Sequence, residues 1–356
     1  MNKEAFDFLN ILTDTPSPSG FETPVQKLIR ERLENIADDV RTDVHGNVIS
    51  VINPGADLRV MLAGHCDEIG FMVQHVTDSP PRGYVYFSAI GGIDPAIVAG
   101  QRVVIHSAKG PVNGVVGRKP IHMMEKEERG KPEKLHKLWI DIGAKDEKDA
   151  LKSIAIGDPI TFDVGLRQLK NNLLAARGFD DRIGAFVVVE TMKRLKGKKL
   201  DVAVYGVSTV QEEIGLRGAR TSAFGIDPHV GIAVDVGFAS DYPSADKKRI
   251  GDVKVGKGPI LNRGANINPV VGRMLVDVAG AKKIPYQMTG SPRATGTDAN
   301  VMQINRAGAA TALVSVPNRY MHTPVEVVSK DDVDNCIKLL AEFCRALKSD
   351  TDFTPR

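Results

Sequence analysis

The chain opens with a helical pattern of apolar residues and then changes to strand-like patterns. After a first helix and a turn, apolar side chains recur between residues 25 and 36 at the spacing of an amphipathic helix. The segment Thr23-Pro24-Val25-Gln26 has the form of a helix start with a capping box. Continuous apolar runs follow at residues 47–52 and 58–63, and the second leads directly into Gly64-His65-Cys66-Asp67-Glu68. We therefore expect an α/β unit with polar residues at the end of a buried strand.

Between residues 71 and 166 the pattern changes to short β-type runs separated by turns rich in glycine and proline. The runs cover residues 84–89, 102–105, 112–116, 139–142 and 159–162. Such spacing is typical of a small β-domain. Inside this region, residues 123–137 are dense in Lys and Glu and nearly free of apolar side chains, which predicts an exposed loop without a catalytic role.

Helix-like and strand-like patterns alternate again after Asp180. We expect a helix at residues 183–195, strands at 201–209, 229–236 and 311–316, and a C-terminal helix that begins after a capping residue at Ser329. The sequence therefore predicts one α/β catalytic domain in two parts, residues 1–70 and 167–356, with a β-domain inserted at residues 71–166.

Composition and charge narrow the possible partners. The 47 basic and 44 acidic residues are mixed along the chain and give a net charge of only +3, so we expect no nucleic-acid partner and no attraction to anionic lipid. No apolar stretch has the length of a membrane span, and the N-terminus does not resemble a signal peptide. Three sparse cysteines fit a reducing compartment better than a disulfide framework. We therefore expect a cytoplasmic protein.

Histidines and acids recur at or just beyond the ends of the apolar strand-like runs. They are His65 and Asp67, Asp180 and Asp181, Glu212 and Glu213, Asp235, and His322. One such residue alone is more often a satisfied core or surface group. Imidazoles and carboxylates brought to the same edge of a sheet, however, are the ligands that a pair of divalent metal ions requires.

Local spacing suggests separate roles for some of these residues. In an extended segment, residues two apart point the same way, so Asp67 is placed to accept a hydrogen bond from the ring nitrogen of His65 that does not bind metal, while Cys66 points to the opposite face. Asp235 lies inside a buried apolar run, where a carboxylate is costly unless it is paired or bound to metal. Asp181 has a simpler explanation, because acids are favoured at a helix start.

Glu212 and Glu213 are adjacent after a buried strand. Neighbouring carboxylates repel each other, and a site near the core accommodates both only if a cation compensates or one of them is protonated. One acid bound to metal and one acting as a general base would satisfy this requirement. A solvated acidic turn is the alternative explanation for the pair.

Together, these residues form motifs that resemble those of the tetrahedral aminopeptidases, a family that includes glutamyl aminopeptidases and proteins once labelled endoglucanases. The motifs are Gly64-His-Cys-Asp-Glu-Ile-Gly-Phe, Phe179-Asp-Asp-Arg-Ile-Gly, Gln211-Glu-Glu-Ile-Gly-Leu-Arg-Gly-Ala, Asp235-Val-Gly and Met321-His-Thr-Pro-Val-Glu. Further similar segments are Ser19-Gly-Phe-Glu, Gly92-Ile-Asp-Pro, Ile140-Asp-Ile-Gly-Ala and Gly296-Thr-Asp-Ala. The resemblance covers nearly the whole chain and implies a three-layer zinc-peptidase domain with a mixed sheet and an inserted small β-barrel.

The resemblance also implies a ligand set for two divalent metal ions, with zinc or cobalt favoured and manganese possible. Asp180 would bridge both ions, His65 and Asp235 would complete one site, and Glu213 and His322 would complete the other. Such a site would activate a water molecule for attack on the first peptide bond of a substrate.

Two further roles follow from the same resemblance. Glu212 would be the general base, and Asp67 would orient His65. Family members often carry Asn at the position of Asp181, so the resemblance assigns no role to this residue. A cis peptide after the bridging Asp occurs in related peptidases.

Several alternatives remain open at this point. A related dinuclear amidohydrolase, such as a carboxypeptidase or a deacylase, would share the ligands, and a catalytically silent shell or binding protein would keep the fold. A glycosidase lacks support, because it would need an acid and base pair of carboxylates without the histidines. The resemblance further implies that the β-domain pairs subunits and that six pairs close into a dodecameric shell acting on peptides. The sequence leaves open the preferred N-terminal residue, the native metal, and the choice between dimer and dodecamer.

Overall fold

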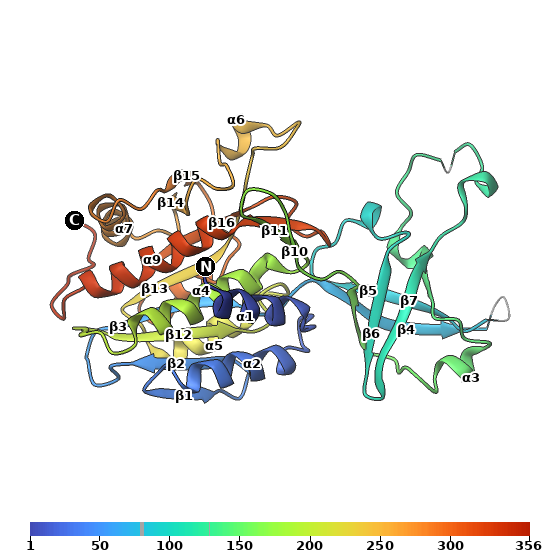
Figure 1. Cartoon of the computed structure of the whole chain (residues 1–356), viewed down its shortest axis with the longest axis horizontal. Helices are drawn as coiled ribbons and strands as arrows, with labels where there is room; N and C mark the ends of the chain where they lie inside the picture. Colours follow the sequence, from blue (N-terminus) through green and yellow to red (C-terminus); the bar gives the residue numbers. More distant parts are fainter. Residues whose placement is uncertain (79–81, 128) are drawn as a thin grey trace.

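The computed structural model describes residues 1–78, 82–127 and 129–356. Two parts lie side by side along the long axis of the molecule: an α/β unit that contains both termini, and a smaller β-barrel (Figure 1). The barrel is inserted into the sequence of the α/β unit, because its strands run from Gly70 to Phe162.

An eight-stranded mixed sheet forms the centre of the α/β unit, in the order β1-β2-β12-β3-β13-β16-β14-β15. The strands are β1 (Asp39–Thr42), β2 (Val48–Ile52), β3 (Arg59–His65), β12 (Ala203–Thr209), β13 (Val230–Phe238), β14 (Ile260–Gly264), β15 (Gln287–Ser291) and β16 (Ala310–Asn318). The four central strands, β12, β3, β13 and β16, are parallel. Their carboxyl ends therefore meet at one edge, where open α/β sheets place their functional sites.

Helices cover both faces of this sheet. They are α1 (Lys3–Asp14), α2 (Thr23–Glu34), α4 (Phe179–Leu195), α7 (Pro269–Ala281) and α9 (Lys330–Ala346) on one face, and α5 (Arg217–Ile226) and α8 (Ala299–Gln303) on the other. Strand β3 shows how the layers are separated, because Val60 and Leu62 pack into the first core while Met61 and Ala63 pack into the second. A strand that is buried on both faces reads as a continuous apolar run, as this one does.

The inserted barrel is closed by six strands in the order β4-β5-β8-β7-β6-β9. They are β4 (Gly70–Thr77), β5 (Tyr84–Ile90), β6 (Arg102–Ser107), β7 (Gly110–Gly117), β8 (Trp139–Asp141) and β9 (Pro159–Phe162). The ring of Phe71 is fully buried and meets Phe87 and Phe162 edge-on, with centroids 5.0 and 5.3 Å apart. The barrel therefore has a core of its own.

Smaller elements complete the structure. A three-stranded sheet contains β10 (Arg167–Gln168), β11 (Leu173–Ala176) and β17 (Glu326–Ser329). Short helices are α3 (Glu147–Ala150), α6 (Lys247–Ile250) and three 3₁₀ turns at Pro95–Ile97, Ile121–Met123 and Leu135–Lys137. None of the helices in the described ranges is long and apolar enough to cross a membrane.

The predicted mixed α/β fold with an inserted barrel is confirmed, and each predicted strand has a counterpart within a few residues. Most of the described residues between 123 and 137 are exposed, apart from the buried Met124, while residue 128 lies outside the described part of the chain. The predicted capping box at the start of α2 is wrong. Glu22 is the N-cap residue, but its side chain makes no capping hydrogen bond to the helix. The Gln26 amide instead donates to the carbonyls of Gly46 and Ser208.

Candidate metal centre

The residues expected from the sequence converge at the carboxyl edge of the central strands. His65 is the last residue of β3, Asp235 lies near the end of β13, and Glu212 and Glu213 follow β12. Asp180 lies in the first turn of α4. His322 comes four residues after the end of β16, so segments that are far apart in sequence meet at this edge.

Asp180 lies between the two histidines. Its Oδ1 is 3.3 Å from Nε2 of His65, and its Oδ2 is 3.2 Å from Nε2 of His322. Two carboxylates lie beside the same imidazole nitrogens, because Oε2 of Glu212 is 3.7 Å from His65 and Oε2 of Glu213 is 3.5 Å from His322. Each oxygen of Asp180 therefore faces a different histidine, as a carboxylate shared by two cations would.

The other ring nitrogen of each histidine is held by a neighbouring group. Nδ1 of His65 lies 3.4 Å from Oδ1 of Asp67 and 3.1 Å from the backbone oxygen of the same residue. Nδ1 of His322 lies 2.8 Å from the backbone oxygen of Gly92, which follows strand β5 of the barrel. With Nδ1 as the donor, Nε2 of each ring is left as a metal ligand.

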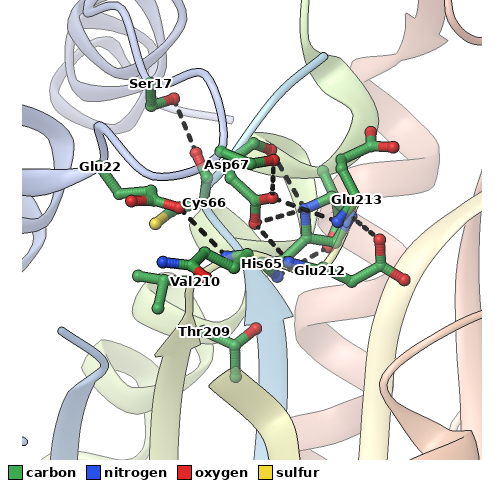
Figure 2. Close-up of polar contacts among 12 residues, drawn as sticks. Ser17, Glu22, His65, Cys66, Asp67, Thr209, Val210, Glu212 and Glu213 are labelled. Carbon is green, nitrogen blue, oxygen red and sulfur yellow. Dashed lines mark hydrogen bonds and ion pairs between the residues drawn. The ribbon is translucent and has the colours of Figure 1, made fainter. Parts of the chain in front are cut away.

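The sequence predicted only that Asp67 orients His65, but Asp67 also contacts the loop that carries Glu212 and Glu213 (Figure 2). Its carboxylate accepts hydrogen bonds from the backbone N–H groups of Glu212 and Glu213, at 3.0 and 3.2 Å, and from the hydroxyl of Ser19 at 2.6 Å. Burial opposes its ionisation, but the contacts with His65 outweigh burial and lower the pKa of Asp67. An ionised Asp67 thus fixes the loop that carries both glutamates.

Glu326 has a comparable role that our reading of the sequence missed. Its two oxygens accept hydrogen bonds of 2.9 Å from the backbone N–H groups of Asp180 and His322. This contact brings the two segments together and accompanies a positive φ of 61° at His322. The residue lies within the Met321-His-Thr-Pro-Val-Glu motif, so a buried acid four residues after an expected ligand was the available signal.

Asp181 is fully buried behind the cluster. Its Oδ1 accepts from the N–H of Gly184 and caps the regular part of α4, and its Oδ2 accepts from the N–H of His65. The helix-start explanation therefore accounts for one of its oxygens. The peptide bond between Asp180 and Asp181 is cis.

The electrostatics of the cluster suit a cation. Burial raises the pKa of Glu212 to about 9 and that of Asp235 to about 8, and repulsion from neighbouring acids adds to both shifts. Burial and the charge of Asp180 also raise the pKa of Glu213 well above its usual range. So many crowded carboxylates either hold protons or bind a positive ion.

The donor set of this cluster fits divalent metal ions. Ligand atoms of His65, Asp180 and Glu213 lie within 4.8 Å of one another, and so do those of His65, Asp181 and Asp235. In the described part of the chain, the buried Oε1 of Glu213 has no hydrogen-bond partner. Imidazole nitrogens with carboxylate oxygens are the usual ligands of zinc, cobalt and manganese.

A hydrogen bond between two buried residues lies next to the cluster. The hydroxyl of Thr209, the last residue of β12, donates a hydrogen bond of 2.6 Å to Oδ2 of the buried Asp298. Burial raises the pKa of Asp298 to about 6. Our sequence interpretation gave Asp298 no role, although it lies in the Gly296-Thr-Asp-Ala segment.

A cavity of about 610 Å³ opens directly over the cluster. Its wall includes His65, Asp180, Glu212 and His322, together with residues of β13, β14, β15 and β16. The expected ligands are therefore accessible to a substrate of peptide size, although most of their side chains are buried.

The model of the M42 glutamyl aminopeptidase family matches residues 46–339. Among curated relatives, the chain is 40% identical to a lysyl aminopeptidase of Pyrococcus furiosus, over 98% of this chain and 99% of that protein. It is 28% identical to a glutamyl aminopeptidase of Lactococcus lactis, over 92% of each chain.

Solved structures of similar proteins share the fold. A TET aminopeptidase from a marine sediment archaeon of the Thaumarchaeota has a TM-score of 0.92 and 35% identity, and the match covers 98% of each chain. The TET1 peptidase of Pyrococcus horikoshii has a TM-score of 0.86 and 29% identity, with 96% of this chain and 100% of that chain covered. That peptidase is described as assembling into a tetrahedron or a large octahedral shell.

Proposed function

The chain belongs to the M42 glutamyl aminopeptidase family and is a metal-dependent aminopeptidase, and we propose that five residues of the carboxyl edge hold its two divalent ions. Asp180 would be shared by the two ions, His65 and Asp235 would complete one site, and Glu213 and His322 would complete the other. The observation that carries this assignment is the position of Asp180, whose two oxygens face the Nε2 atoms of two different histidines at 3.3 and 3.2 Å.

When bound, the two ions would supply Lewis acidity for a water molecule and for the carbonyl of the first peptide bond. Glu212 takes a proton from that water and delivers it to the leaving amine. Its pKa of about 9 reflects burial and neighbouring acids, and positive charge at the ligands would lower this pKa towards the range in which a general base works best. Asp67 keeps Glu212 in place through the backbone N–H of Glu212.

The competing enzyme classes are less well supported. The relatives are aminopeptidases, which favours this activity over a carboxypeptidase or a deacylase with the same ligands. Glu212 also argues against a silent shell, because the proposed ligand set does not need it. Two relatives are named for lysine and for glutamate, residues of opposite charge, so relatedness alone does not fix the residue that this chain removes.

We further propose zinc, cobalt or manganese as the metal, since imidazole and carboxylate ligands suit all three. The three cysteines are free and buried, which supports a reducing compartment such as the cytoplasm. The substrates would be peptides.

The assembly that we propose is a homo-oligomer built from dimers and closed into a dodecamer, with the barrel as the pairing element. Exposed apolar side chains support a partner surface there, since Ile121 is 57% and Met123 69% exposed. The shells described for the TET1 peptidase support the closed form. Light scattering tests it, since a mass near that of one 38.5 kDa chain would contradict any oligomer and a stable dimer would contradict only the shell.

Removal and return of metal test the proposed chemistry. Dialysis against a chelator should abolish turnover of aminoacyl chromogenic amides, and zinc, cobalt or manganese should restore it. A sample dialysed without chelator is the control. Full activity in a sample verified as metal-free would refute the proposal.

A further inference from the structure

The cavity over the metal centre continues sideways along the sheet, beyond the proposed ligands. Asp235 of β13 is paired with Ser315 of β16, and Ser315 is paired with Ile260 of β14. Adjacent strands lie about 4.8 Å apart, so Ile260 lies about 10 Å from the strand that carries Asp235. This is within reach of the first side chain of a peptide whose amine and first carbonyl lie at the metal centre.

One side of this extension is apolar. Ile260 and Leu313 line it and are themselves almost fully buried, and Met321 also lines the cavity. Gly237 also lines it, and a Cβ added there would lie 2.6 Å from Cδ1 of Ile260 and 3.0 Å from Cβ of Ser315. The glycine therefore lets Ile260 pack closely against β13, which a larger residue at this position would prevent.

The other side is polar but neutral. Asn262 of β14 is paired with Thr289 of β15, and the hydroxyl groups of Thr289 and Ser291 donate to the Asn262 side-chain oxygen at 2.7 and 3.0 Å. These three side chains bond to one another and carry no charge. Within the described residues, every ionisable side chain that lines the cavity belongs to the metal cluster.

We propose that this extension receives the first side chain of the substrate and selects an uncharged, apolar residue of the size of leucine or methionine. The inference rests on the proposed aminopeptidase function. An ammonium or carboxylate placed in the extension would lose water without gaining a counter-charge, whereas an apolar side chain gains from leaving water. Peptides that begin with lysine or glutamate should therefore be poor substrates.

Steady-state kinetics of the metal-loaded enzyme test this selectivity. We expect kcat/KM for leucyl and methionyl p-nitroanilide to exceed that for the lysyl and glutamyl compounds by about a hundredfold or more. Equal or faster turnover of the lysyl or glutamyl compound would overturn the inference and leave the aminopeptidase function intact. Turnover of none of the four compounds would overturn both.

A change of charge in the wall tests its position. Asn262→Asp places a carboxylate in the extension, and the ratio of lysyl to leucyl kcat/KM should rise about tenfold or more. Asn171→Asp is the matched control, since Asn171 is exposed, lies outside the cavity wall and should leave the ratio unchanged. An unchanged ratio in a folded Asn262→Asp enzyme would overturn the assignment of this wall. If that variant does not fold, the comparison of the four p-nitroanilides with the wild-type enzyme decides whether the proposed selectivity holds.

Discussion

Two groups of buried acids lie at the same edge of the sheet, and they differ in what balances their charge. Glu68, three residues after His65, is only 2% exposed and forms ion pairs with Arg177 and with Arg182, the latter at 2.9 Å. Burial opposes the ionisation of Glu68, but the two arginines outweigh burial and lower its pKa.

The metal cluster shows the opposite balance. Burial raises the pKa of Glu212, Glu213 and Asp235, and no arginine of the described ranges offsets it. In the described residues, Glu212 and Glu213 pair with histidines and not with arginines or lysines. Charge balance within the chain thus serves folding, whereas an excess of negative charge serves to bind a cation from outside.

The largest expected effect is on stability, at the balanced acid. Glu68→Gln leaves Arg177 and the fully buried Arg182 without their counter-charge, so the free energy of unfolding should fall by about 3–5 kcal/mol. Urea unfolding of the metal-loaded protein measures this loss. Glu34→Gln is the control, because Glu34 is 56% exposed and its pair with Arg30 should contribute less than about 0.5 kcal/mol. A loss below about 1 kcal/mol at Glu68 would contradict the comparison.

The next effect is a pH dependence confined to the metal-free protein. The pKa values of Asp235 and Glu212, about 8 and about 9, exceed their ordinary values of 3.8 and 4.5. The folded protein then holds protons that the unfolded chain has lost, so unfolding releases protons and a rise in pH destabilises the fold. Each proton released contributes about 1.4 kcal/mol per pH unit, so for these two groups the free energy of unfolding should fall by about 2.7 kcal/mol per pH unit between about pH 5 and about pH 8.

Metal should remove this slope, since bound cations keep the carboxylates ionised in the folded state. Denaturant unfolding at several pH values, with and without metal, compares the two forms. A metal-free protein whose stability rises over the same range would show that the acids are not held protonated.

The third effect separates the two adjacent glutamates by function. Glu212→Gln should retain both metal ions and lower kcat by about a hundredfold or more, because the general base is lost. Glu213→Gln should lower the metal content itself, because a ligand is lost. Metal analysis and kinetics on both variants distinguish the roles, and near-normal turnover of Glu212→Gln would end its assignment as the base.

The smallest effect concerns an acid that is balanced by neither arginine nor metal. Thr209→Val removes the hydroxyl that donates to Asp298 and should lower the free energy of unfolding by about 1 kcal/mol. Thr351→Val, which removes an exposed hydroxyl contact to the carbonyl of Lys348, is the control and should have a smaller effect. Equal losses in the two variants would mean that burial of Asp298 adds nothing to the value of this hydrogen bond.

Much of the site could be predicted because strand ends leave a clear pattern in the sequence. Buried apolar runs contain or precede His65, Asp235 and Glu212. Because successive side chains of a strand point to opposite faces, the position in the run predicts the face towards which each side chain points. Helix α7 was missed, although Asn268 before Pro269 is a recognisable start and the Asn268 side chain accepts from the N–H groups of Val270 and Val271.

Other contacts could not be predicted, because they join residues that are distant in the sequence. Gln26 bonds to the carbonyl of Ser208, 182 positions away, in place of the local cap that its spacing indicated. Glu326 accepts from the N–H of Asp180 across 146 positions, and although its place in the motif marks Glu326 as notable, the local pattern does not specify Asp180 as its partner. The neutral wall around Asn262 likewise depends on the pairing of β14 with β15, which no periodicity specifies.

The hydrogen bond between His322 and Gly92 limits how modular this protein is. The two residues are 230 positions apart, and they join an expected ligand of the α/β unit to a loop of the inserted barrel. A shortened chain in which the barrel is replaced by a simple linker would keep the ligand residues but lose the acceptor that fixes the imidazole of His322. The barrel therefore cannot be replaced without an effect on the site, and a redesigned insertion has to restore a carbonyl at the position of Gly92.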